Sequence, residues 1–371
     1  MGTDFDLEVI ERAFVEAAID PTKWNGAMEV VSRATGCVGA LLFDTESHLP
    51  GIPQTESMAG AVESYIKGGW IEHDVRYGVT PHLIRKGIAT DLDLFSADQI
   101  ARHPYYQEFL APHRLRWCAC VKMASSGILW SLSLQRSISQ GPFSPAQLQT
   151  LATLSHRLGT ASAMSRMLGF ARVDSALEAF EMSQIAAIVF DARGYVVKLN
   201  ASAESMMDGA LGIVGSRLYS YDRNATNAFN RSLKQILVDG SSSAAAPVAL
   251  PRPGLYPILA HVLGIKYAAF NPLAPGQAVA VLIDPEMRRT PGLAAIQACF
   301  SLSAAESKLA YRLASGQSLE EVAKACSISY ETARNQLKAV FGKTGTHRQS
   351  ELVALLSRLC RLPAKTVVGR F

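Results

Sequence analysis

The chain has 371 residues, of which 49% are hydrophobic and 18% are charged. This length is more than one ordinary domain needs, and the composition excludes an intrinsically disordered chain. No stretch approaches about eighteen uncharged apolar residues, and the acidic N-terminus lacks the basic and apolar segments of a secretion signal. We therefore expect no membrane segment.

The six cysteines are scattered and form no C-x-x-C pair: Cys37, Cys118, Cys120, Cys299, Cys326 and Cys360. No cysteine–histidine set has zinc-finger spacing either. The sequence therefore predicts neither a disulfide framework nor a structural metal site, and we expect a reduced, cytoplasmic protein.

Charge is divided unevenly along the chain. Residues 288–371 hold thirteen Lys and Arg against five Glu, a net charge of +8, which leaves −4 for residues 1–287. A basic end on a slightly acidic body is the electrostatic pattern of a module that binds a polyanion such as nucleic acid. Because one end of any chain is the more basic, charge alone does not decide the matter.

The first stretch of the chain predicts helices that flank an antiparallel sheet. Helices are expected where apolar residues recur at helical spacing, over 7–18, 24–34 and 58–70. Strands are expected where short apolar runs end in turn residues, over 37–43, 117–123 and 129–136. A capping box at Ser144, with proline at the first helical position, opens a long helix to about residue 168. This order of elements predicts an α+β layer of the kind found in sensor domains.

An apolar stripe runs along that long helix at intervals of three or four residues: Leu148, Leu151, Leu154, Leu158 and Ala161. Two uses of the stripe are open. It can pack on the chain's own sheet, or it can form a dimer seam between two copies.

Residues 175–286 have a different rhythm. Strands are expected over 185–191 and 195–199, and Asn200 is suited to cap a short helix. A longer helix, a run of Gly, Ser and Ala, and two closing strands follow over 222–238, 239–246, 259–267 and 278–283. This order resembles a PAS domain over about a hundred residues.

The C-terminal end carries the most specific pattern. Capping boxes at Ser303 and Ser318 open two short helices. Ser329 caps a third helix over 330–341, and a fourth is expected over 349–361. Two short helices joined by a tight turn, the second carrying basic residues, are helix-turn-helix geometry.

This segment resembles the LuxR/GerE family of bacterial helix-turn-helix regulators, with residue type and spacing in agreement across all four helices. The residues that carry the resemblance are Leu302, Ser303, Glu306, Gly316, Gln317, Ser318, Glu321, Val322, Ala323, Ile328, Ser329, Thr332, Ala333, Arg334, Lys343 and Gly345. The resemblance covers about sixty residues and implies a transcriptional regulator that binds double-stranded DNA.

The third helix places Arg334 and Lys338 one turn apart, with Asn335 alongside. Arginine suits the O6/N7 edge of guanine and asparagine the N6/N7 edge of adenine, while Thr332 and Lys343 would hold phosphates. One such module offers too few base contacts to stand out against a genome, so we expect a homodimer on a two-fold related DNA site. An ordinary solvated helix surface is the alternative for this face.

Trp70, Asp74 and Arg76 lie close together after a predicted helix, and Trp117 begins a later strand. Aromatic rings with a few convergent polar groups are typical of a small-molecule pocket, so we expect a small organic ligand near these four residues. Asp74 and Arg76 would pair with polar ligand groups or with each other. The layout resembles GAF-like domains that precede LuxR-type modules. The alternative is that the aromatic residues belong to the core.

The sequence contains no G-x-S-x-G elbow, no H-E-x-x-H and no complete phosphate-binding loop, so we expect no enzyme. Cys118 and Cys120 alternate on a strand and should share a buried face. The PAS-like unit lacks the Asn-Cys-Arg run of light-sensing flavin domains, and we expect no cofactor. The alternative is a redox or gas-sensing regulator with a cofactor in that unit.

The expected fold is a multidomain α+β chain with antiparallel sheets in two sensor domains. These are a GAF-like domain over 1–170, which ends in the long helix, and a PAS-like domain over 171–287. A linker over 288–299 leads to an all-α, four-helix LuxR-type helix-turn-helix domain over 300–371. The expected function is ligand-responsive regulation of transcription.

Overall fold

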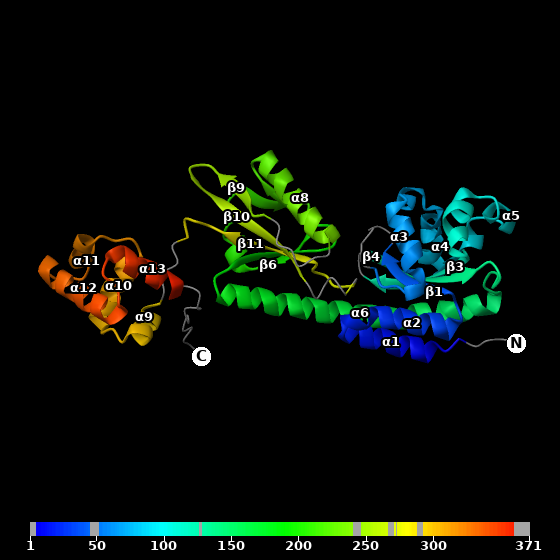
Figure 1. Cartoon of the computed structure of the whole chain (residues 1–371), viewed down its shortest axis with the longest axis horizontal. Helices are drawn as coiled ribbons and strands as arrows, with labels where there is room; N and C mark the ends of the chain where they lie inside the picture. The colour runs from blue at the N-terminus through cyan, green and yellow to red at the C-terminus, as the bar shows by residue number, and fades with distance from the viewer. Residues whose placement is uncertain are drawn as a thin grey trace.

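A computed structural model of the chain describes residues 5–44, 52–125, 128–239, 246–265, 271, 273–287 and 292–359. Most of the expected Gly, Ser and Ala run, the start of the expected linker and Cys360 lie outside these described residues. The chain forms two antiparallel-sheet units along one long helix, followed by a cluster of helices (Figure 1). The expected mixture of helices and antiparallel sheets with a helical end is confirmed in that coarse form.

The first unit is a four-stranded antiparallel sheet in the order β1-β4-β3-β2. Its strands are β1 (Gly39–Asp44), β2 (Ile88–Thr90), β3 (Leu115–Ser125) and β4 (Ile128–Ser137). One face is covered by α1 (Leu7–Ile19), α2 (Trp24–Thr35) and the first half of α6 (Pro145–Met182). The other side carries α3 (Ala59–Lys67), α4 (Thr80–Lys86) and α5 (Ala97–Ile100). The sequence did not predict β2 or α4.

Strand β4 shows how the two faces differ. Leu132 and Leu134 are fully buried in the core against α1, α2 and α6. Because side chains alternate along a strand, Ser133 and Gln135 point to the opposite face, and both are also buried. The sheet therefore presents polar groups beneath α3 and the turns around it.

Helix α6 begins at the predicted capping box. The Ser144 hydroxyl accepts a hydrogen bond from the Gln147 amide (3.3 Å), and Gln147 Oε1 accepts one from the Ser144 amide (3.0 Å). The apolar stripe is buried against the chain's own sheet and α1 through Leu151, Leu154, Leu158 and Ala161. The use of this stripe as a dimer seam is therefore wrong, because the chain's own core already covers it.

The second unit is a five-stranded antiparallel sheet in the order β6-β5-β11-β10-β9. Its strands are β5 (Ala186–Phe190), β6 (Val196–Leu199), β9 (Val248–Arg252), β10 (Leu255–Gly264) and β11 (Ala278–Ile283). Helix α8 (Arg223–Asp239) packs on one face. On the other face, Val173 and Leu177 of α6 pack against β5, so α6 crosses the boundary expected at residue 170.

Two local features of the second unit complete it. Helix α7 (Ala201–Glu204) begins at the predicted cap, where Asn200 Oδ1 accepts a hydrogen bond from the Ala203 amide (3.0 Å). Strands β7 (Leu211–Val214) and β8 (Arg217–Ser220) form a separate hairpin. The sequence predicted neither this hairpin nor β9.

The C-terminal cluster contains α9 (Leu293–Phe300), α10 (Ala304–Ala314), α11 (Leu319–Ala325), α12 (Tyr330–Thr344) and α13 (Gln349–Leu359). The last four are the predicted helices. The linker expected over 288–299 is corrected by α9, because Ile296 is fully buried in the same core as Leu309 and Leu356. The described helical cluster therefore begins near Gly292.

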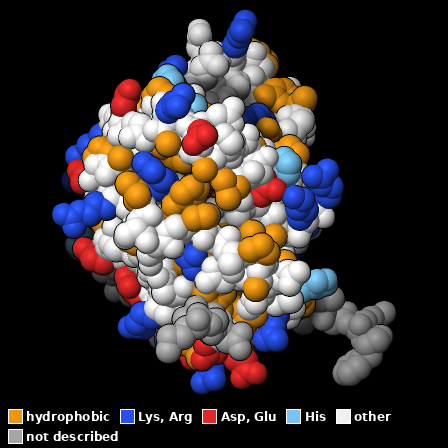
Figure 2. All heavy atoms as spheres, turned by 90° about the vertical axis from the view of Figure 1, so that its right-hand side faces the viewer, with side chains coloured by type: hydrophobic (Ala, Val, Ile, Leu, Met, Phe, Trp, Pro, Cys, Tyr) orange, Lys and Arg blue, Asp and Glu red, His pale blue; other side chains and the backbone are white. Residues whose placement is uncertain are grey.

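No helix among the described residues is both long and apolar enough to cross a membrane. Figure 2 shows the face of the molecule at the right of Figure 1, where the first unit lies. Basic and acidic side chains are interspersed there with small apolar groups. Among the described side chains on this face, both signs of charge are therefore present.

Candidate DNA-binding helix and ligand pocket

Local hydrogen bonds set where α11 and α12 begin, on either side of a tight turn. The Ser318 hydroxyl accepts from the Glu321 amide (3.2 Å), and Glu321 Oε2 accepts from the Ser318 amide (2.7 Å). Ser327 has a positive φ of 54° and turns the chain between the helices. The Ser329 hydroxyl then accepts from the Thr332 amide (3.1 Å), so both helices begin where the capping residues predicted.

Helix α12 has one buried and one exposed face. Ala333, Leu337 and Val340 are buried in the C-terminal core. The predicted base-reading residues Arg334, Asn335 and Lys338 lie on the exposed face of the same helix. Among the described residues, Arg334 has one weak ionic contact, to Glu331 at 3.7 Å, and both side chains are about 70% exposed. Little free energy therefore opposes its reorientation toward a binding partner.

The two predicted phosphate contacts lie near the ends of α12. Thr332 is exposed, and its hydroxyl lies 2.8 Å from the Ser329 hydroxyl. Lys343 Nζ donates to Glu306 Oε2 (2.6 Å), which also accepts from the Ser303 amide (2.7 Å). The hydrogen bonds from Lys343 and from the Ser303 amide lower the pKa of Glu306. The Lys343 side chain is exposed, and its ion pair with Glu306 links the end of α12 to the start of α10.

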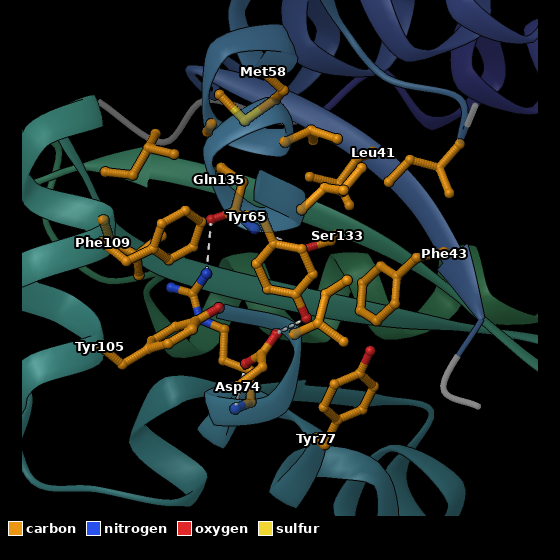
Figure 3. A pocket seen from close by; sticks show the side chains of 18 of the residues that line it. Leu41, Phe43, Met58, Tyr65, Asp74, Tyr77, Tyr105, Phe109, Ser133 and Gln135 are labelled. Carbon is orange, nitrogen blue, oxygen red and sulfur yellow. Dashed lines mark hydrogen bonds between the residues drawn. The ribbon is translucent and has the colours of Figure 1, made fainter. Parts of the chain in front are cut away.

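A cavity of about 250 Å³ lies in the first unit between the sheet and α3 (Figure 3). Its apolar lining includes Leu41 of β1, Met58 before α3 and Phe109 of the π-helical turn η6 (Tyr105–Leu110). Ser133 and Gln135 of β4 supply polar groups from the sheet. An apolar cavity with a few convergent polar groups is the usual form of a small-molecule site.

Asp74 lines this cavity and precedes the 3₁₀ turn η4 (Val75–Val79). Its Oδ2 accepts a hydrogen bond from the Tyr65 hydroxyl (2.8 Å), and its Oδ1 accepts one from the Arg76 backbone amide (2.8 Å). Figure 3 shows the Asp74 carboxylate and the Tyr65 hydroxyl pointing toward each other. Burial and the charge of Asp74 raise the pKa of Tyr65 far above its usual value, so this hydroxyl keeps its proton and donates.

Arg76 also lines the cavity, but its side chain pairs with Asp91. Nε donates to Asp91 Oδ1 (2.8 Å), Nη1 to Gln135 Oε1 (3.1 Å) and Nη2 to the Arg116 carbonyl (3.0 Å). Asp91 accepts further hydrogen bonds from the Tyr106 hydroxyl (2.6 Å) and the Cys118 amide (2.5 Å). The expected option that Asp74 and Arg76 pair through their side chains is therefore wrong, because Asp91 takes the guanidinium.

Trp70 and Trp117 are not among the residues that line the cavity. Trp70 stacks on Phe109, with ring centroids 5.5 Å apart and an angle of 26° between the rings. Trp117 is half-buried in the same aromatic cluster, and its Nε1 has no hydrogen-bond partner. Of the four predicted ligand residues, the structure brings Asp74 and Arg76 to this cavity. Trp70 lines a second, neighbouring hollow together with Asp74.

Sequence reasoning missed several residues that line the cavity. Tyr65, Tyr105 and Phe109 come from helical segments whose apolar residues look like ordinary core. The sequence pattern could have indicated Ser133 and Gln135, because these polar residues alternate with leucines in one strand. Both faces of this strand are buried. Polar residues on a buried face need partners, and here they lie beside a cavity.

Cys118 and Cys120 share a buried face of β3, as predicted, with their Sγ atoms 3.6 Å apart. The hydrogen bond with Cys120 and burial raise the pKa of Cys118, so this thiol stays protonated and unreactive. Cys120 lines the cavity. Within the described part of the chain, no group of three or more His, Cys, Asp or Glu residues is placed to hold a metal ion.

Comparisons with known proteins give distant likenesses in structure alone. No family model matches the chain, and no curated protein does. A phage VqmA–DPO complex shares 14% identity with a TM-score of 0.23, covering 55% of this chain and 97% of that one. A Vibrio cholera VqmA–ligand–DNA complex shares 16% identity with a TM-score of 0.23, covering 52% and 92%. The Escherichia coli DhaR(N)–DhaL complex shares 13% with a TM-score of 0.24, covering 74% and 86%. Likeness at this level assigns no function to the chain.

Proposed function

We propose that this protein is a ligand-responsive transcriptional regulator whose C-terminal helices form a LuxR-type DNA-binding domain. The observation that carries the proposal is the pairing of α11 and α12 through a tight turn, with Arg334, Asn335 and Lys338 exposed on α12. The opposite face of α12 is held in the core. A rigid helix that offers Arg, Asn and Lys on one face is suited to the major groove.

Each exposed residue has a proposed part in DNA binding. Arg334 reads guanine and Asn335 reads adenine through paired hydrogen bonds, and Lys338 lies one turn after Arg334 on the same face. Thr332 and Lys343 contact phosphates and set the register of the helix on the duplex. Lys343 has to share its ammonium group between a phosphate and Glu306, since the two are paired in the free protein.

The first unit is proposed as a GAF-like sensor that binds a small organic ligand in the cavity beside Asp74 and Arg76. Trp70 supports the cavity wall through Phe109. Val238, near the end of α8 in the second unit, lines the same cavity. A ligand held there would therefore contact both sheet units, which gives it a route to influence more than its own domain.

The remaining assignments complete the proposal. The domain limits are 1–170 for the GAF-like unit, 171–287 for a PAS-like unit and about 292 onward for the DNA-binding helices. The PAS-like unit serves as a second sensor or as a dimerisation surface. The protein binds its partners rather than catalysing a reaction, and it acts in the cytoplasm, where bacterial DNA is accessible.

We further propose that two copies bind a two-fold related DNA site. One α12 offers few base contacts, and a genome presents a vast excess of competing sites. Two copies bound at half-sites about one helical turn apart multiply the discrimination. The apolar stripe of α6 (Leu151, Leu154, Leu158 and Ala161) is buried in the core of the first unit. The surface through which two copies pair therefore has to lie elsewhere on the chain.

The test is selection of binding sites from a random DNA library with the full chain, combined with sedimentation of the protein alone and on the selected DNA. We expect an enriched sequence with two inverted halves and a complex that contains two chains. A library that shows no enrichment contradicts the DNA-binding proposal. A single chain bound to an asymmetric site contradicts the dimer alone.

A further inference from the structure

The charged residues around the cavity of the first unit do not balance. Asp74 and Arg76 both line it. Arg76 is already neutralised by Asp91 in a nearly enclosed pair, with the two side chains 9% and 1% exposed. Asp91 does not line the cavity, so a ligand meets Arg76 as half of a neutral pair.

Asp74 has no such cationic partner. Its two oxygens accept from the Tyr65 hydroxyl and the Arg76 backbone amide, which are neutral donors. Among the residues that the structure describes, no Lys, Arg or His side chain forms an ion pair with it. Among the described residues that line the cavity, Asp74 is therefore the charged group without a partner of opposite charge.

Aromatic rings surround this carboxylate. Tyr65, Tyr77 and Tyr105 lie around Asp74 in Figure 3. Phe109 packs against Tyr65 and Tyr105, with ring-centroid distances of 5.6 and 5.3 Å. The faces of aromatic rings carry partial negative charge and attract cations, most strongly where water is excluded. The Arg76 guanidinium already lies over the Tyr105 ring, 5.7 Å from its centroid, so Asp74 is the main group that favours a cationic ligand.

We propose, building on the ligand-responsive function above, that the ligand of this cavity is a small cationic amine. Its ammonium group contacts Asp74 and the tyrosine rings, and its apolar body lies against Phe109, Leu41 and Met58. An anionic ligand would add a second negative charge beside Asp74, at a cost that grows as water is excluded. The cavity volume of about 250 Å³ favours a ligand with a small apolar body.

The test measures binding of matched probes to the full chain without DNA, by calorimetry and thermal shift. Each amine is compared with an alcohol of the same carbon body: benzylamine with benzyl alcohol, phenethylamine with phenylethanol, and tryptamine with tryptophol. Phenylacetate is the anionic probe. We expect at least one amine to bind about tenfold or more tightly than its alcohol, and phenylacetate to bind most weakly. Equal binding of amines and alcohols, preference for phenylacetate, or no binding of any probe overturns the proposal.

Two variants locate the effect. Asp74→Asn keeps the size of the side chain and should lower the affinity of the best amine about tenfold while leaving its alcohol unchanged. Asp98→Asn, at an exposed acid of α5 outside the cavity, should change neither. Unchanged amine affinity in Asp74→Asn overturns the proposal, and if that variant does not fold, the comparison of amines with alcohols on the unaltered chain decides. The DNA selection reads out α12 and not the cavity, so failure of the amine proposal leaves the regulator proposal standing.

Discussion

The C-terminal helices and the cavity of the first unit are built in opposite ways. In the C-terminal cluster, capping boxes join residues three positions apart, as between Ser303 and Glu306. Around the cavity, the partners of Arg76 lie 15 and 59 positions away, at Asp91 and Gln135. Local bonds set where each helix starts, while the site in the first unit exists only once distant segments have met. Helix starts set by local hydrogen bonds can be predicted from a sequence, whereas a site formed by distant segments cannot.

The sharpest contrast concerns the buried Arg76–Asp91 pair. Arg76→Met leaves the Asp91 carboxylate enclosed without a cation, and loss of one partner of a buried ion pair costs about 3–5 kcal/mol. We expect the free energy of unfolding of the first unit to fall by that amount in urea titrations. Lys86→Met is the matched control, because its pair with Asp93 is far more exposed and should cost less than about 1 kcal/mol.

A second substitution separates charge from packing in that experiment. Asn at position 91 removes the charge and keeps one acceptor oxygen, which can serve either the Tyr106 hydroxyl or the Cys118 amide, since these bond to different oxygens of Asp91. Asp91→Asn in the Arg76→Met background should therefore recover part of the loss. An equal or larger loss in the double variant contradicts the view that an uncompensated charge causes the instability.

The capping box of α10 tests the local side of the comparison. Ser303→Ala removes the hydroxyl that accepts from the Glu306 amide and should destabilise the C-terminal helices by about 1 kcal/mol. Hydrogen exchange of α10 amides measures the loss locally. Ser357→Ala is the control, because that hydroxyl bonds only within the last turn of α13 and alanine favours helix. Equal exchange in the two variants would show that tertiary packing, not the cap, holds the start of α10.

A smaller effect depends on pH. The pKa of Glu306 is lowered in the folded protein, first by the hydrogen bond from Lys343 and then by that from the Ser303 amide. A carboxyl of this kind stabilises the fold above its ordinary pKa of 4.5, and the contribution is lost as the pH falls through the lower, folded value. Between about pH 6 and pH 3, α10 in the unaltered chain should lose up to about 1 kcal/mol more than in Glu306→Gln. If hydrogen exchange shows that α10 loses the same stability in the unaltered chain and in Glu306→Gln over this pH range, the Glu306 carboxylate does not stabilise α10.

The same contrast explains which parts of the fold and the site could be predicted. Ser144, Ser303, Ser318 and Ser329 marked helix starts because each bonds to an amide three residues on. Helix α9 was missed because Gly292 precedes it without a side-chain cap, and its burial depends on α10 and α13. In the first unit, Asp74 and Arg76 were identified by residue type. Their partners were not, because pairing with Asp91 requires knowledge of the sheet.

Site residues follow the same division. Arg334, Asn335 and Lys338 were placed by helical periodicity alone, and they share the exposed face of α12 as expected. Trp70 and Trp117 were grouped with the cavity by proximity in sequence and by aromatic character. Neither property says which cavity a ring lines. Trp70 stacks on Phe109 behind the first cavity and lines a second, neighbouring hollow with Asp74.

The most direct measurement of the central claim is a binding-site selection with Arg334→Ala beside the unaltered chain. If α12 reads bases, this variant should lose preference at one position in each half-site, with a cost of about 1–3 kcal/mol for the previously favoured base. Arg358→Ala, at an exposed arginine of α13, is the matched control and should keep the full preference. An unchanged sequence preference in Arg334→Ala would contradict the assignment of α12 as the recognition helix.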